Sequence, residues 1–256
     1  MATAIEINNL TVKFGDLVAL HDVSLTVEQH EFVVLLGPSG CGKTTMLSVL
    51  ANLLTPAGGE AKLHRFADGG KGKNFGYVFQ QAALLPWFSV MKNITLGLAA
   101  IGTPKAEAER IAQEYINLLN LTGFEKAYPH QLSGGMQQRV GLARALAIDP
   151  EVLLMDEPFG ALDAQTRVLL QEELLRIWER DRKTVLFVTH SIEEAVLLAD
   201  RVVVLTARPG VVKAIVDIDV PRPRSTRDVQ AAARFAELEA ELWGLVRDEA
   251  VKALNV

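Results

Sequence analysis

The chain has 256 residues, 49% of them hydrophobic and 6% aromatic, a composition that suits a compact enzyme and argues against a disordered protein. Its formal net charge of -5 gives no electrostatic case for binding nucleic acid, which needs a basic stripe. The single cysteine, Cys41, rules out an internal disulfide, so a reducing cytoplasm is the natural compartment.

Neither a signal peptide nor a membrane span is expected. The N-terminal sequence has no basic start and no continuous apolar region. The apolar runs elsewhere are far shorter than the roughly 20 residues that a helix needs to cross a bilayer. If the protein works at a membrane, another chain must do the spanning.

Short β-branched runs predict strands, and helical stretches separate them from Lys43 onward. The first strands have short connections and polar interruptions, which favour an antiparallel lobe. Helix-rich sequence from Val90 to Leu121, with Pro104 placed to open a helix, indicates an inserted helical lobe. From Glu151 the strands alternate with helices and are apolar throughout, as in parallel βαβ units. The predicted fold class is therefore α/β with a parallel core.

The C-terminal region reads as a linker followed by helix. Residues 219–228 combine prolines and arginines. Ser225 with Asp228 fits a helix start. The apolar residues that follow recur at the spacing of one helix face: Val229, Ala233, Leu238, Leu242 and Leu245. We expect a cassette over residues 1–220, with a helical subdomain at about 85–145, and a linker and helical tail over 221–256.

A phosphate-binding loop follows the apolar run FVVLL and precedes a predicted helix. Gly37, Gly42, Lys43 and Thr44 satisfy G-x-x-x-x-G-K-[ST]. The glycines let backbone N–H groups turn toward phosphates, the lysine reaches the terminal phosphates, and the threonine offers a hydroxyl to Mg²⁺. A chance glycine-rich turn is the alternative, which the strand and helix on either side disfavour. The predicted ATP-binding loop comprises Gly37, Pro38, Ser39, Gly40, Cys41, Gly42, Lys43, Thr44 and Thr45, with no catalytic role for the Cys41 thiol.

In the segment EVLLMDEP, from Glu151 to Pro158, two acids follow an apolar run. Asp156 is placed to hold Mg²⁺ directly or through water, and Glu157 to polarise a water that attacks the γ-phosphate. Paired acids in a solvated turn are the alternative. The presence of a phosphate-binding loop in the same sequence favours the catalytic interpretation.

The segment LSGGMQQR, from Leu132 to Arg139, makes the prediction specific. It opens a helix with a hydroxyl and free N–H groups that suit an anion. Here the sequence resembles the ABC ATPase family over nearly the whole chain. The resemblance implies that this signature contacts the γ-phosphate held by a second subunit, so that two chains sandwich two ATP molecules. The signature residues are Ser133, Gly134, Gly135 and Gln137.

The resemblance implies four further site residues. Phe14 would stack on adenine, although a strand phenylalanine is more often a core residue. Gln80 would reach Mg²⁺ and the attacking water. Asp163 matches the D-loop that links the two sites, and its alternative is a helix N-cap. His190 would contact the γ-phosphate and steady Glu157, so the expected catalytic set is Glu157, His190 and Lys43, with Thr44, Gln80 and Asp156 as metal ligands.

The stretches LLPW and TARPG resemble the importers of taurine, aliphatic sulfonates and nitrate. In that family they belong to the contact with the membrane subunits and to the C-terminal region, away from any ligand pocket. The resemblance implies ATP and Mg²⁺ as cofactors, a homodimer in the ATP-bound state, two transmembrane permease subunits and, indirectly, a substrate-binding protein. The chain would sit peripherally on the cytoplasmic face of the inner membrane.

Other functions stay open at this point. An ABC exporter or lipid transporter would use the same cassette chemistry. A soluble ABC ATPase would carry a coiled-coil insertion or a second cassette, and a GTPase would need a base-reading motif such as NKxD; neither pattern is found. One departure from the family is Asn52, where glycine is usual.

Overall fold

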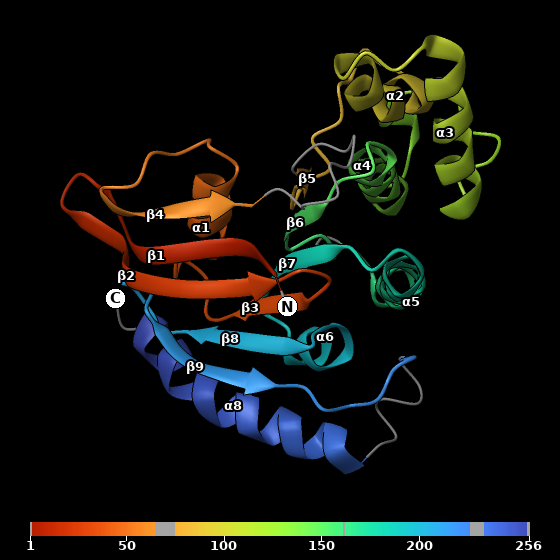
Figure 1. The fold of residues 1–256 in the computed structure, drawn as a ribbon. Coiled ribbons are helices and arrows are strands. Elements are labelled where there is room, and N and C mark those ends of the chain that lie inside the picture. Colours follow the sequence, from red (N-terminus) through yellow and green to blue (C-terminus); the bar gives the residue numbers. More distant parts are fainter. Residues whose placement is uncertain (1, 65–74, 161, 226–232, 255–256) are drawn as a thin grey trace. The chain divides into compact units, whose positions relative to one another are not determined.

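The computed structural model describes residues 2–64, 75–160, 162–225 and 233–254 (Figure 1). The chain forms two compact units, one made of Met1–Gly69 with Leu175–Val256 and the other of Gly70–Leu174. The predicted boundary between a cassette ending at 220 and a tail starting at 221 stays a prediction.

The N-terminal part of the first unit is an antiparallel sheet. Its strands are β1 (Thr3–Phe14), β2 (Leu17–Glu28) and β4 (Gly58–Leu63), in the order β2-β1-β4. Alternate apolar residues of β1, such as Ile5 and Ile7, are completely buried, so one face of the sheet belongs to the core. The predicted antiparallel lobe is confirmed.

The parallel core of the same unit surrounds β3 (Phe32–Leu36). This strand pairs in parallel with β7 (Thr184–Thr189) and β8 (Arg201–Leu205), and β9 (Val212–Asp217) adds an antiparallel edge to β8. Every residue of β3 and β7 is buried, which explains why their sequences are apolar rather than alternating. Among the described residues, the helices that lie wholly in this unit are α1 (Lys43–Leu50), α6 (Ile192–Leu198) and α8 (Ala233–Leu254).

Helix α8 is the predicted tail helix, and it lies beside β8 and β9 in Figure 1. Leu238 and Leu242 are completely buried, as their spacing predicts, and Leu245 is half-buried. The proposed helix-start residue Asp228 and the proposed helical Val229 lie outside the described residues.

The second unit contains a parallel pair of strands and a helical part. The strands are β5 (Phe75–Val78) and β6 (Val152–Asp156). The chain between them forms α2 (Val90–Ala100), α3 (Lys105–Leu118), the short 3₁₀ helix η1 (Pro129–Gln131) and α4 (Gly134–Ala147). Pro104 directly precedes α3, as predicted. Helix α5 (Ala164–Asp181) begins in this unit and ends in the first.

Asn52 occupies a left-handed backbone conformation, with φ of 56°. It follows the end of α1, where the family usually has glycine. Asparagine tolerates this region better than most residues with a side chain, and the left-handed residue allows Leu53 N–H to donate to Ser48 O at 2.8 Å. The substitution therefore keeps the backbone geometry of a helix C-terminus.

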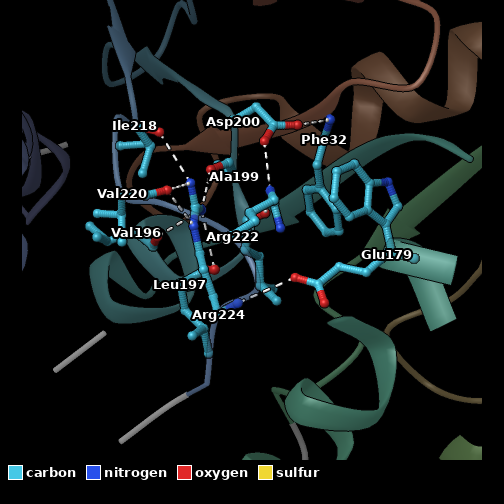
Figure 2. A network of polar contacts seen from close by, with 12 residues as sticks. Phe32, Glu179, Val196, Leu197, Ala199, Asp200, Ile218, Val220, Arg222 and Arg224 are labelled. Carbon is cyan, nitrogen blue, oxygen red and sulfur yellow. Dashed lines mark hydrogen bonds and ion pairs between the residues drawn. The ribbon is translucent and has the colours of Figure 1, made fainter. Parts of the chain in front are cut away.

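Two arginines of the linker close the C-terminal end of α6 (Figure 2). Arg224 is 6% exposed. Its guanidinium donates to three carbonyls at the end of α6 and to two carbonyls in the chain segment just before Arg224. The acceptors are Val196, Leu197, Ala199, Ile218 and Val220. Arg222 donates to Leu198 O, so the four carbonyls from 196 to 199 all have a partner. Burial lowers the pKa of Arg224 to about 10, which leaves the group charged at neutral pH.

The same linker reaches the start of β3 (Figure 2). Arg222 also pairs with Asp200, whose other carboxylate oxygen accepts from Phe32 N–H at 2.9 Å. The guanidinium lies over the ring of Trp178, 4.1 Å from its centre, which favours a cation–π interaction. The linker thus connects α6, α5 and the first residue of the central strand.

Replacing Arg224 with methionine should lower the free energy of unfolding by about 2–4 kcal/mol, because five buried carbonyls lose their donor. Urea denaturation measures this change. The control is Arg234→Met on α8, whose exposed ion pairs with Asp219 and Glu237 are worth under about 1 kcal/mol. Equal effects of the two substitutions would contradict the assigned role.

Candidate active site

The register of the central strands places two predicted site residues beside each other. Leu36 of β3 pairs with Thr189 of β7 in parallel. Gly37 directly follows β3 and His190 directly follows β7, so the chain leaves the sheet at the same edge in both places. The start of the phosphate loop and the exposed His190 are neighbours because two buried strands end level.

The phosphate-binding segment leaves β3 at Gly37, turns tightly at Gly42 and ends in the first turn of α1 with Thr45. The backbone of Gly42 has φ of 99°, and a Cβ at this position would lie 2.5 Å from Leu20 Cδ2. Only glycine fits there. Ser39 and Gly40 are exposed at the top of the loop, whereas Cys41 is 1% exposed and burial raises the pKa of its thiol. The prediction that Cys41 has no catalytic role stays a prediction.

Lys43 turns back over its own loop. Its ammonium group donates to Gly37 O at 2.7 Å and to Pro38 O at 3.0 Å, and the residue is 4% exposed. No carboxylate pairs with Lys43 in the described part of the chain. Helix α1 starts at this residue with neither a side-chain cap nor an acid in its first turn. A buried cation and an uncapped helix start together fit a polyphosphate.

Strand register also explains the second unit's part of the site. Val78 of β5 pairs with Met155 of β6 in parallel, so Gln80 and Glu157, two residues further on, lie at the same edge. Gln80 Nε2 donates to Glu157 Oε2 at 3.2 Å. The amide predicted to reach the attacking water thus contacts the carboxylate predicted to polarise it.

Glu157 has a left-handed backbone, with φ of 42°, directly after the buried Asp156. A residue with a long side chain pays for this conformation, and such strain is concentrated at functional sites. The turn separates the last strand residue, Asp156, from the half-buried Glu157. The two acids therefore have different surroundings although they are adjacent in sequence.

The signature segment begins α4 in the same unit. Ser133 is the N-cap and accepts from Met136 N–H at 3.3 Å, and Gly134 and Gly135 form the first turn. Gln137 donates to Pro129 O at 2.9 Å and Leu132 O at 3.3 Å, so its amide holds the preceding loop. Contact of Gln137 with ATP of a second subunit stays a prediction.

Two residues of α4 that the sequence analysis did not single out join the signature helix to the Gln80 segment. Gln138 Nε2 donates to Phe79 O at 3.1 Å. Arg144 donates to Ala82 O at 2.8 Å and to Ala83 O at 2.9 Å. Backbone carbonyls leave no mark in sequence, so no motif could have revealed these contacts.

The remaining predicted residues lie on loops and strand ends. Asp163 accepts from Thr166 N–H at 3.0 Å near the start of α5, which agrees with the N-cap alternative, and this bond contributes most to lowering its pKa. Phe14 ends β1 and is 50% exposed, so it is available for stacking rather than part of the core.

The segment TARPG lies beside the phosphate loop. Thr206–Gly210 follows β8, and Arg208 Nε donates to Gly40 O at 3.3 Å in the phosphate loop. Gly210 also approaches Cys41 closely. The expectation that this stretch lies away from any ligand pocket stays a prediction.

No helix in the described ranges is long and apolar enough to cross a membrane. Within those same ranges no three His, Cys, Asp or Glu side chains form a metal-binding group. The phosphate loop between β3 and α1, with its buried lysine, places the chain among the P-loop nucleotide-binding proteins.

Comparisons with known proteins extend this assignment. Residues 20–160 match the family described as ABC transporter. The chain is 51% identical to the uncharacterized ABC transporter ATP-binding protein MJ0412 of Methanocaldococcus jannaschii, over all of this chain and 96% of that protein. It is 46% identical to the taurine import ATP-binding protein TauB of Rhizobium johnstonii, over 89% and 88% of the two chains. The chain belongs to the ABC transporter family, as an ATP-hydrolysing cassette.

Solved structures agree in fold. The dimeric structure of MJ0796, a bacterial ABC transporter cassette, matches with a TM-score of 0.74 and 34% identity. The match covers 85% of this chain and all of that one. A second structure of MJ0796, in a post-hydrolysis state bound to ADP and Pi, has a TM-score of 0.73. The predicted α/β cassette fold is confirmed.

Changing Glu157 to glutamine should reduce kcat for ATP hydrolysis by about 10²–10⁴-fold while ATP still binds, because the amide keeps the shape but cannot act as a base. Phosphate release measures turnover, and size-exclusion chromatography with ATP detects the dimer that the variant should trap. Glu109→Gln, an exposed change on α3, is the control. Normal turnover by the Glu157 variant would show that another group is the base.

Proposed function

We propose that this ATPase powers import of a small anionic or zwitterionic solute of the taurine, sulfonate and nitrate type. The observation that carries the proposal is the 46% identity to taurine import ATP-binding proteins of three bacteria, across 81–89% of this chain. The chain would act through two separate membrane subunits, peripherally on the cytoplasmic face of the inner membrane, with a binding protein that delivers the solute.

The proposed catalytic centre uses Lys43, Glu157 and His190. Lys43, already surrounded by carbonyls of its loop, would bind the terminal phosphates together with the N–H groups of Gly37–Thr45. Glu157 would accept a proton from the attacking water, with Gln80 holding its carboxylate, as their 3.2 Å contact supports. His190 would contact the γ-phosphate and hold Glu157 in position.

Mg²⁺ is proposed as the metal, with Thr44, Gln80 and Asp156 as the residues that would hold it. A hydroxyl, an amide oxygen and a carboxylate are the hard oxygen donors that Mg²⁺ prefers. When bound, the ion would neutralise charge on the phosphate oxygens. The buried position of Asp156 at the end of β6 suits a carboxylate that holds a cation.

We also propose that two copies assemble head to tail when ATP is bound. MJ0796 is dimeric in its solved structure, and the exposed Ser133 at the start of α4 would face the nucleotide of the second copy. Phe14, half-exposed, would stack on adenine, and Asp163 would link the two sites.

Reconstitution tests the direction and the solute. Proteoliposomes that contain this chain, its membrane subunits and the binding protein should accumulate labelled taurine or a related sulfonate only with ATP, and a Lys43→Ala complex should not. The cognate binding protein should show a thermal shift with the same solute. ATP-dependent movement in the opposite direction would assign an exporter, and a lipid as the only substrate would assign a lipid transporter.

A further inference from the structure

The loop Thr206–Gly210 lies directly against the outside of the phosphate loop, within the first unit. Gly210 has the closest approach, since a Cβ there would lie 2.0 Å from Cys41 O. Gly210 N–H donates to Ala19 O at 2.9 Å, and Gly210 O accepts from His21 N–H at 3.1 Å. The loop is therefore fixed between the phosphate loop and strand β2.

Internal hydrogen bonds make this loop rigid. The Thr206 hydroxyl accepts from Val211 N–H at 3.0 Å and donates to Pro209 O at 2.9 Å. Thr206 N–H donates to Val211 O at 3.0 Å. These bonds join the two ends of the loop to each other.

A buried carboxylate of α8 holds the other side of the loop. Glu249 is 2% exposed and accepts from Ala207 N–H at 3.0 Å and from Lys213 and Lys252, each at 2.9 Å. Burial alone would raise the pKa of Glu249, but these three hydrogen bonds together lower it to about 2. The C-terminal helix thus contacts the loop through a charged group.

Arg208 transmits this position to the phosphate loop. Its guanidinium pairs with no acid in the described ranges, and it donates to Gly40 O. That carbonyl and the N–H of Cys41 belong to one planar peptide and point in opposite directions. A donor that holds the carbonyl therefore also holds the Cys41 N–H, which donates to Pro38 O at 3.4 Å and closes a turn of the phosphate loop.

We propose that Arg208 and Glu249 are positioning residues for ATP binding, through which helix α8 holds the phosphate loop in the shape that accepts phosphate. The inference rests on the proposed role of Gly37–Thr45 in binding ATP. Neither residue contacts the reacting atoms, so their effect falls on affinity and not on the chemical step.

The test measures KM for ATP, kcat and binding of a fluorescent ATP analogue by the full chain. Arg208→Ala should raise KM and the dissociation constant about three- to tenfold, with kcat at saturating ATP within about twofold. Arg208→Lys, which keeps a donor, should recover part of the affinity. Glu249→Gln should act in the same direction, and the double variant should lose less than the product of the single effects, because both residues act through one loop.

Glu237→Gln, an exposed change on the same helix, is the matched control and should leave all values unchanged. Wild-type affinity in Arg208→Ala, or independent effects in the double variant, would overturn the inference. Because Arg208 is exposed, its variants test the proposal even if Glu249→Gln does not fold. A wild-type chain that fails to bind the analogue, or a Lys43→Ala variant that binds it normally, would instead refute the role of the phosphate loop itself.

Discussion

The constraint on which the site depends is that neighbouring parallel strands end at the same edge of their sheet. In one unit this sets Gly37 beside His190, and in the other it sets Gln80 beside Glu157. Residues more than 70 positions apart in the sequence become neighbours in this way, and Gln80 and Glu157 are also joined by a direct hydrogen bond. Because β3 and β7 are buried along their whole length, a slip in register would move an apolar residue at a strand end out of the buried part of the sheet. The strand register that keeps the apolar residues buried therefore also determines where the site residues lie.

Sequence predicted the strands, the phosphate loop and the signature helix because each has a local cause. Apolar β-branched runs mark buried strands, glycine at position 42 marks a turn that excludes a side chain, and Ser133 marks a helix start. The resemblance placed Gln80 and Glu157 at the same water, but their direct hydrogen bond was not predictable, since nothing in the sequence states that β5 and β6 are neighbours in register. Helix α8 was predicted from a helix-start signal and the spacing of apolar residues, but its contact with the Thr206–Gly210 loop was not.

Three of the contacts that the sequence did not reveal share one physical origin: arginines that donate to backbone carbonyls. Arg144, Arg208 and Arg224 each hold a loop or a helix end in this way. An ion pair can be guessed from opposite charges at a suitable spacing, whereas a carbonyl is present at every residue and carries no signal. The planar fork of the guanidinium suits this role, because several carbonyls can be bound at fixed angles. The sequence therefore shows where the arginines are, but not which carbonyls they bind.

The position of Cys41 has a chemical consequence. The only thiol of the chain is buried at the centre of the phosphate loop, 1% exposed, with burial raising its pKa. An alkylating or oxidising reagent needs the exposed thiolate, so it reacts only after the loop has opened locally. The rate of labelling is then a direct readout of how often the loop opens, without any introduced probe. Any ligand that holds the loop closed would protect this one sulfur from modification.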